Sequence, residues 1–267
     1  MAAIERFCSR AKKLYCPYCG TESLAFGHFG ICRTCEAPLS QRKADVSASD
    51  NALVAANAQI AKLYSGGDAE KAAAALDAKL STHSEPGFLL AAGLFYIRYS
   101  NDELKKIRYD LDGFMEENAV HRENAEKLML HAKMLLNHSV KAAEKNAAGG
   151  ESMSMNYIPF LAEIKLGHEK GAEYYLGRIK NDENVYLKDY AEIVMHAHTK
   201  KPESLLEHCD RMIRDGKVNF NVFYYIGYAL FMKKAYADAR TVLEYLVKVG
   251  ELDTAKILLT DMDRLYG

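Results

Sequence analysis

Four cysteines in two closely spaced pairs constrain the N-terminal part of this chain more than any other feature. The pairs are Cys16-Pro-Tyr-Cys19 and Cys32-Arg-Thr-Cys35, with two residues inside each pair and twelve between the pairs. Four thiolates at this spacing suit one tetrahedral Zn²⁺ ion, because each pair closes a tight turn that directs both sulfur atoms inward. Gly20 favours such a turn after Cys19, since glycine readily adopts a left-handed backbone. The sequence therefore predicts one structural zinc ion bound by Cys16, Cys19, Cys32 and Cys35.

Two other interpretations of these cysteines compete with zinc. Cys-Pro-Tyr-Cys also resembles the active-site motif of glutaredoxin-like oxidoreductases, but that chemistry needs the motif between a strand and a helix, and here a second pair follows instead. Disulfide bonds would suit a secreted chain, yet the segment from Met1 to Leu14 lacks the apolar run of a signal peptide. Zinc is therefore favoured, and neither Cys8 nor His28 is expected to be a ligand.

The residues between the pairs indicate a short β-hairpin that carries the second turn. They are Leu24, Phe26, Phe29 and Ile31, with Gly27 and Gly30. On the four cysteines and Gly20, residues 14–38 resemble a zinc ribbon, a rubredoxin-like family with two cysteine knuckles. The resemblance implies a structural metal site, and it says much less about function.

Charge and composition divide the chain near residue 43. Residues 1–43 hold seven Lys and Arg against three Glu, a net charge of +4, and residues 44–267 carry −5. The hydrophobic content of 49% excludes a disordered chain, and no apolar stretch reaches the roughly 18 residues of a membrane span. We expect a basic zinc ribbon at 1–43, a helical domain at 44–267, and a cytoplasmic protein with no membrane partner.

Beyond residue 40 the apolar residues recur at spacings of three and four, which predicts ten to twelve helices and essentially no strand. The longest unbroken pattern runs from Arg122 to about Asn146. Short polar or glycine-containing segments are expected to separate the helices. They are Ser65–Asp68, Glu85–Gly87, Ser100–Asp102, Gly149–Gly150, Asn181–Asp182 and Asp215–Gly216.

A repeat becomes visible from Phe223 onward. Small residues at Gly227 and Ala239 and an apolar pair at Leu243 and Leu246 are typical of two antiparallel helices that cross closely. With Phe223 and Tyr236, this segment resembles a tetratricopeptide repeat (TPR), and the resemblance implies a TPR-like α-solenoid. Steps of 33 or 34 residues place further helix pairs at 186–199/202–215 and 155–166/169–180. The segment from Leu63 to Ala72 indicates another repeat-like helix–turn–helix, within 53–80. The region 86–150 departs from this period.

Aromatic residues on the first helix of each predicted pair are candidates for partner binding. Tyr157, Tyr190 and Tyr224 recur at spacings of 33 and 34, and Tyr228 and Phe231 extend the same set. In the TPR family that helix lines the concave surface, where a tyrosine ladder could bind an extended peptide. Packing between neighbouring helices is the alternative. His196 with His198, and His208 with Cys209, point apart on a helix and are not expected to bind metal together.

These features together predict a mostly α protein, a TPR-like α-solenoid with a small N-terminal β zinc ribbon. No phosphate loop, nucleophile elbow or dinucleotide motif is present, so we expect a non-enzymatic adaptor or scaffold that binds a protein or peptide and no small-molecule substrate. The alternative is a nucleic-acid-associated factor of transcription or translation, whose basic ribbon contacts DNA or RNA. Four aromatic residues that interleave with Arg and Lys, namely Tyr15, Tyr18, Phe26 and Phe29, would suit base stacking, although aromatic residues in so small a module usually form its core.

Overall fold

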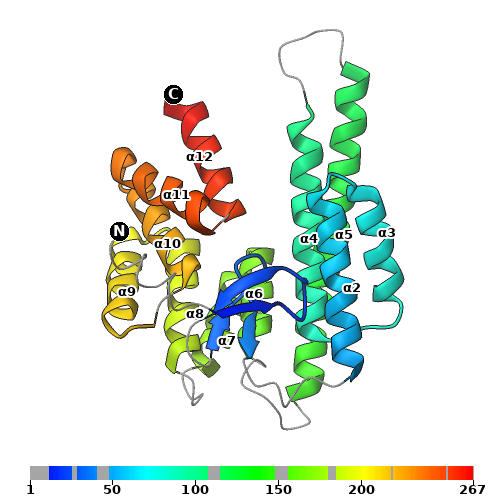
Figure 1. Cartoon of the computed structure of the whole chain (residues 1–267), viewed down its shortest axis with the longest axis horizontal. Helices are drawn as coiled ribbons and strands as arrows, with labels where there is room; N and C mark the ends of the chain where they lie inside the picture. Colours follow the sequence, from blue (N-terminus) through cyan, green and yellow to red (C-terminus); the bar gives the residue numbers. More distant parts are fainter. Residues whose placement is uncertain are drawn as a thin grey trace. The chain divides into compact units, whose positions relative to one another are not determined.

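Four short strands precede eleven helices in the part of the chain that the computed structural model describes (Figure 1). The described residues are 12–25, 29–40, 48–107, 115–147, 156–179, 185–217, 219–250 and 252–266. The strands are β1 (Lys12–Tyr15), β2 (Glu22–Ala25), β3 (Phe29–Ile31) and β4 (Pro38–Ser40). The helices are α2 (Ala48–Ser65), α3 (Ala69–Leu80), α4 (Pro86–Lys105), α5 (Met115–Ala147), α6 (Tyr157–Leu166), α7 (Glu169–Ile179), α8 (Val185–His198), α9 (Pro202–Arg214), α10 (Phe220–Met232), α11 (Tyr236–Gly250) and α12 (Asp253–Tyr266).

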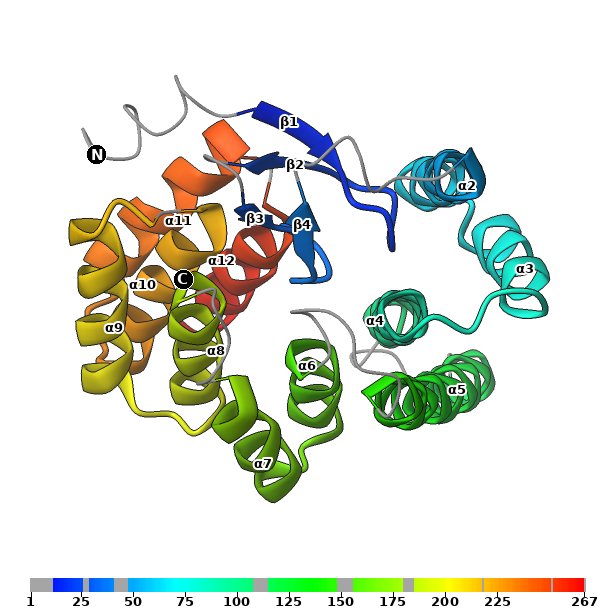
Figure 2. The ribbon, with the colours of Figure 1, turned by 90° about the horizontal axis from the view of Figure 1, so that it is seen from below.

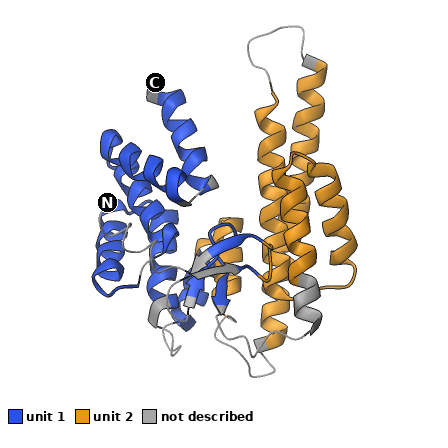
Figure 3. Ribbon diagram, viewed as in Figure 1, with its two compact units in different colours: residues 1–16, 21–47, 170–267 blue, residues 17–20, 48–169 orange. Residues whose placement is uncertain are grey.

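The backbone contacts divide the chain into two compact units (Figure 3). Unit 1 comprises residues 1–16, 21–47 and 170–267, and unit 2 comprises residues 17–20 and 48–169. The boundary expected at residues 43 and 44 falls in 41–47, outside the described residues. Each compact unit combines residues from both sides of this boundary, since unit 1 joins residues 21–47 with 170–267 and unit 2 joins residues 17–20 with 48–169.

The strands form two separate antiparallel hairpins, drawn in blue in Figure 2. In the first, β1 pairs with β2, with Tyr15 opposite Glu22, and in the second β3 pairs with β4, with Ile31 opposite Pro38. The predicted hairpin over residues 24–31 was therefore wrong, because β2 pairs with the preceding strand, β1, and β3 pairs with the following strand, β4. Each cysteine pair therefore lies in the turn of its own hairpin, Cys16 and Cys19 between β1 and β2, and Cys32 and Cys35 between β3 and β4.

Local sequence explains where several helices begin and end. The backbone of Gly67 is left-handed (φ 88°), and the Asp68 side chain then accepts a hydrogen bond from the backbone N–H of Lys71 at the start of α3. Pro86 begins α4, where its missing N–H leaves no partner unsatisfied. Ser100 does not end a helix as expected, because its hydroxyl donates to the carbonyl of Ala125, 2.8 Å away, and α4 continues. The predicted breaks at 149–150 and 181–182 lie outside the described residues.

In unit 2, α4 and α5 lie side by side, and α3 and α6 pack against them (Figure 1). α4 buries an almost continuous apolar run that includes Phe88 and Leu90. Gly93 lets the two long helices approach closely, since a Cβ there would lie 2.9 Å from Leu136. The long helix expected from residue 122 is confirmed as the 33-residue α5.

In unit 1, each of the helices α8 to α12 packs against the next one along the chain. At the crossing of α10 and α11, a Cβ on Gly227 would lie 2.9 Å from Leu243, and Ala239 is completely buried. The small residues therefore occupy the close crossing that the sequence pattern predicted. The helices expected from the sequence match described helices, and within the units α2 packs against α3, α8 against α9 and α10 against α11.

Candidate metal centre

The four predicted ligands meet at one point. Their Sγ atoms all lie within 4.8 Å of one another, and Cys16, Cys32 and Cys35 are buried. The Sγ atoms of Cys16 and Cys35 are 3.6 Å apart. Two sulfurs on one tetrahedral metal ion lie about 3.8 Å apart, given metal–sulfur bonds of roughly 2.3 Å. A disulfide would require about 2.05 Å. The cluster therefore has the dimensions of a four-thiolate metal site.

Both knuckles are tight turns of the same design. In the first, the backbone N–H of Cys16 donates to the carbonyl of Thr21 (3.0 Å), and in the second the N–H of Cys32 donates to that of Ala37 (2.9 Å). The residue after the second cysteine of each pair has a left-handed backbone, Gly20 with φ 71° and Glu36 with φ 60°. Gly20 was expected from the sequence, whereas its counterpart Glu36 was not, because glutamate rarely adopts this conformation.

Backbone and hydroxyl donors surround the sulfur of Cys32. The N–H of Thr34 lies 3.4 Å from it, and the buried hydroxyl of Ser23 lies 3.6 Å from it. Ser23 is oriented by the N–H of Arg33, which donates to the serine oxygen over 3.1 Å. Such donors stabilise the negative charge of a ligating thiolate and orient it toward a metal. The sequence did not predict a role for Ser23 at this site, because a single serine in a strand does not indicate which atoms it contacts.

The surroundings of Cys-Pro-Tyr-Cys do not match the redox interpretation. The motif lies between β1 and β2, and no helix follows it within residues 12–25 and 29–40. The four cysteines, together with Cys209, are free of disulfide bonds. Cys209 is fully buried on α9, and burial raises the pKa of its thiol to about 12. Cys8 and His28 lie outside the described residues.

The first knuckle is bound by α2, within unit 2. The buried side-chain amide of Asn57 donates to the carbonyl oxygens of Pro17 (3.0 Å) and Tyr18 (3.1 Å). A Cβ at Gly20 would lie 2.1 Å from the backbone carbon of Asn57. Glycine is therefore required here for two reasons, the left-handed backbone and the close approach of a helix. The ring of Tyr18 lies against Gly87 of α4, where a Cβ would come within 2.5 Å of it.

The second knuckle is bound in a matching way by α8 and α10, within unit 1. The buried amide of Asn221 donates to the carbonyl oxygen of Cys32 over 3.2 Å. One carboxylate oxygen of Glu36, Oε2, accepts hydrogen bonds from the hydroxyls of Tyr190 (3.1 Å) and Tyr225 (2.9 Å). Each knuckle therefore has a buried asparagine that donates to its backbone, one from the start of the helical region and one from its last third.

The five aromatic residues proposed for partner binding do not share one exposed surface. Tyr157, in unit 2, and Tyr190, in unit 1, are completely buried, so neither side chain faces solvent. Tyr224 and Tyr228 are partly buried, and their rings stack with centroids 6.3 Å apart. Burial and the charge of Glu36 raise the pKa of Tyr224. Phe231, also partly buried, packs against Tyr236.

The side chains of Tyr157 and Tyr190 are covered by the surrounding protein. The expectation that Tyr157 and Tyr190 contact a partner is therefore corrected, because a fully buried ring has no free surface. Partner binding by Tyr224, Tyr228 and Phe231 stays a prediction.

The structure brings together two histidines whose pairing the sequence did not predict. The rings of His196 on α8 and His208 on α9 lie 4.7 Å apart. His208 contacts an oxygen through each ring nitrogen, the carboxylate of Glu192 and the carbonyl of Ser204, both at 2.9 Å. Burial lowers the pKa of His196, and the neighbouring His208 and Lys201 lower it further. Within the described part of the chain, the four cysteines are the only group of three or more metal-binding side chains that converge.

No known family model matches this chain, and neither a curated protein nor a solved structure matches it. Among the described residues, no helix combines the length and the apolar character that crossing a membrane requires.

Proposed function

We propose that the four-cysteine cluster binds one Zn²⁺ ion with a structural role. Four thiolates satisfy all positions of a tetrahedral ion, so no position is left for water or substrate, which a catalytic zinc site needs. The Sγ atoms of Cys16 and Cys35 are 3.6 Å apart, and hydrogen-bond donors surround the Sγ atom of Cys32. Both observations support this assignment. Bound zinc would hold the two hairpins together, because their own apolar core is too small to do so.

We further propose that the protein is a non-enzymatic adaptor that binds a protein partner through its helical region. The observation that carries this proposal is the crossing of α10 and α11, where Gly227 and Ala239 allow close packing against Leu243. This is the packing that the tetratricopeptide-like pattern requires, and helical repeats of this kind serve as binding surfaces. The TPR-like arrangement itself remains part of the proposal.

The ribbon supports the same proposal, since its knuckles are bound by helices. Asn57 and Tyr18 connect the first knuckle to α2 and α4, and Asn221 and Glu36 connect the second to α10. A ribbon that reads nucleic acid needs exposed aromatic rings beside its basic residues. Tyr15 is exposed, but Tyr18 packs on a helix.

Affinity capture with nuclease treatment tests the proposed function. The full-length, zinc-loaded protein is used as bait, with and without nuclease, and retained proteins are then tested for direct binding as purified components. We expect a partner that is retained after nuclease treatment and binds the purified protein. Replacing Tyr228 and Phe231 by alanine should weaken that binding, whereas Lys234→Ala should not. Retention that disappears with nuclease, together with direct and strongly salt-dependent binding to RNA or DNA, would contradict the adaptor proposal and favour the nucleic-acid alternative.

A further inference from the structure

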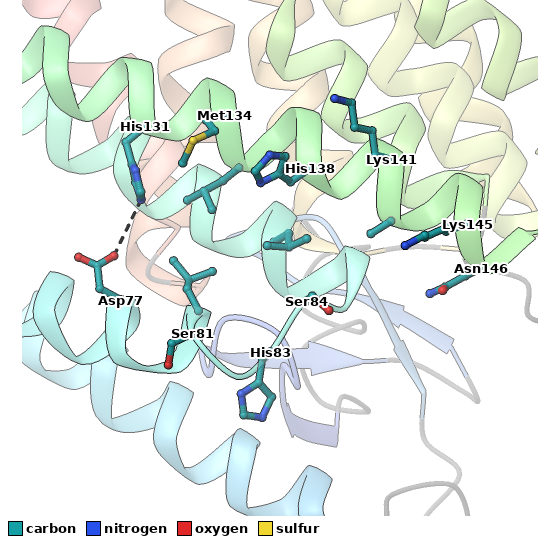
Figure 4. Close-up of a pocket in the computed structure, with 14 residues that line it drawn as sticks. Asp77, Ser81, His83, Ser84, His131, Met134, His138, Lys141, Lys145 and Asn146 are labelled. Carbon is teal, nitrogen blue, oxygen red and sulfur yellow. Dashed lines mark ion pairs between the residues drawn. The ribbon is translucent and has the colours of Figure 1, made fainter.

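A groove of about 860 Å³ runs along α5 in unit 2 (Figure 4). Its walls are α3 with the following loop on one side and α5 on the other, and Leu89 of α4 contributes to the lining. On α5 the lining residues are spaced by three or four, from His131 to Lys145, so they follow one face of the helix. Fourteen residues of helix span about 21 Å, so the groove suits an elongated ligand.

The lining changes in character along the groove. Lys141 and Lys145 lie toward one end, and His131 with Asp77 lies toward the other (Figure 4). The lining also includes the apolar side chains of Leu80, Leu89 and Leu135, and His138 lies between His131 and Lys141 (Figure 4). A ligand that fits this site therefore needs apolar groups along its length and polar or charged groups at its ends.

The lysines give the groove a positive charge. The lining holds two lysines and one carboxylate, although residues 44–267 as a whole carry a net charge of −5. The carboxylate, Asp77, already accepts a hydrogen bond from the hydroxyl of Tyr96, 2.6 Å away. No ion pair involves Lys141 or Lys145 within the described residues, and both side chains are exposed. The site is therefore complementary to a negatively charged ligand.

One polar atom of the groove has no hydrogen-bond partner. Nε2 of His131 is buried, and within the described part of the chain it has no hydrogen-bond partner. The carboxylate of Asp77 is 3.9 Å away, which is too far for a hydrogen bond. This nitrogen has no exposed surface, so it contributes no contact to a ligand in the groove.

Apolar surface continues on α5 beside the groove. Met134, which lines the groove, is 44% exposed, and Leu130, one turn earlier, is 72% exposed. Leu130 lies outside the lining of the groove, so a small molecule confined to the groove would leave this side chain exposed. A protein segment would cover both the groove and the neighbouring leucine.

From these observations we infer that the groove between α3 and α5 binds a short acidic segment of a partner protein that also carries apolar side chains. An extended segment of about six residues spans the groove, at roughly 3.3 Å per residue. Its carboxylates pair with Lys141 and Lys145, and its apolar side chains contact Leu80, Leu89 and Leu135. The inference rests on the proposed adaptor function and specifies the chemistry of the partner.

Fluorescence anisotropy with defined peptides tests this inference on the full-length, zinc-loaded protein. The probes are labelled twelve-residue peptides in which glutamate and leucine alternate or follow a helical spacing, and the control peptides carry glutamine in place of glutamate. We expect the glutamate peptides to bind and the glutamine peptides to bind about tenfold more weakly or not at all. Lys141→Glu should weaken binding by about tenfold, because it places a like charge beside the ligand. Lys133→Glu makes the same change at an exposed position of α5 outside the groove, and it should alter affinity by less than about twofold.

Three results would overturn the inference. The first is that neither glutamate peptide binds the wild-type protein. The second is equal affinity of Lys141→Glu and the wild type. The third is lysine-dependent binding of dodecanoate without binding of the peptides, which would assign the groove to a small amphiphilic anion. If a captured protein partner binds Lys141→Glu as tightly as the wild type, the adaptor function stands and the groove is excluded as its site.

Discussion

The hydroxyl of Tyr225 on α10 donates a 2.9 Å hydrogen bond to the carboxylate of Glu36, which lies 189 residues earlier in the chain. The bond fixes a residue whose backbone is left-handed, a conformation that costs a non-glycine residue about 1–2 kcal/mol. The hydroxyl of Tyr190 donates to the same oxygen atom. The two bonds offset the backbone cost and connect the turn of the second cysteine pair to α8 and α10.

Tyr225→Phe should therefore lower the free energy of unfolding by about 1.5–3 kcal/mol, the usual contribution of a hydrogen bond to a charged group. Urea unfolding at pH 7 measures the change. Tyr224→Phe is the matched control, because its hydroxyl has no hydrogen bond within the described residues, and it should cost less than about 0.5 kcal/mol. Equal effects of the two variants would contradict the assigned role of the Glu36 bond.

Asn57→Ala should destabilise the protein by about 1–3 kcal/mol, because it leaves the carbonyl oxygens of Pro17 and Tyr18 without their donor. Asn137→Ala serves as the control, since this exposed amide bonds only its own helix, at the carbonyl of Lys133. Its expected cost is within about 0.5 kcal/mol. The urea midpoints of the two zinc-loaded variants measure the difference. A smaller loss of stability for Asn57→Ala than for Asn137→Ala would show that α2 does not stabilise the first knuckle.

The purified, reduced protein should contain one zinc ion per chain, and Cys35→Ser should lose it. Elemental analysis, or a colorimetric zinc assay during titration of the thiols with a mercurial, measures the stoichiometry. Removal of zinc should lower the melting temperature but leave most of the helical circular dichroism, because the apolar clusters around Phe223 and around Phe88 contain no cysteine ligand among the described residues. Protein without zinc, or complete loss of helical signal on chelation, would contradict this prediction.

Ala239→Trp should cost about 1–3 kcal/mol or more, since the fully buried methyl group lies at the crossing of α10 and α11 and a larger side chain would force the helices apart. Lys233→Ala removes an exposed ion pair with Glu203 and should cost less than about 0.5 kcal/mol. Thermal unfolding followed by circular dichroism compares the two variants. Equal melting temperatures would show that the two helices do not cross at Ala239.

Acidification should reduce stability partly through His196. In the folded protein the pKa of His196 is lowered by burial and by the neighbouring cations. At pH values between the lower folded pKa and the ordinary value near 6.5, the unfolded chain therefore binds more protons than the folded protein. Stability is therefore lost as the pH falls through about 6.5. His196→Gln should lose less stability than the wild type between pH 7.5 and 5.5, as measured by urea unfolding. Any loss of zinc at low pH affects both proteins, so the difference between their free energies of unfolding at each pH excludes it. Equal losses of stability in the two proteins would contradict the prediction.

The sequence was sufficient for the features that depend on near neighbours. The cysteine pairs predicted the metal site, because each pair closes its own turn, and Gly20 marked the left-handed residue of the first. Periodicity located the helix pairs, including α10 and α11 with Gly227 at their crossing. These signals lie within one turn or one repeat, where the chain itself limits the geometry.

The remaining features depend on contacts between distant segments. Asn57 and Asn221 are single amides in helical patterns, and nothing near them in the sequence indicates that they donate to a knuckle. The spacing that made Tyr190 a partner-binding candidate marks a helix face, but it does not show what covers that face. His196 and His208 meet only because α8 and α9 pack together, so their pairing required the structure.

The distances along the chain between each knuckle and its asparagine imply an order of events during protein synthesis. Asn57 follows Tyr18 by 39 residues, whereas Asn221 follows Cys32 by 189. At about 5–20 residues per second, the first contact becomes available within roughly 2–8 s and the second only after about 10–40 s. The second knuckle therefore leaves the ribosome long before the helix that supports it exists. Its cysteines must capture metal, or remain reduced, throughout that interval.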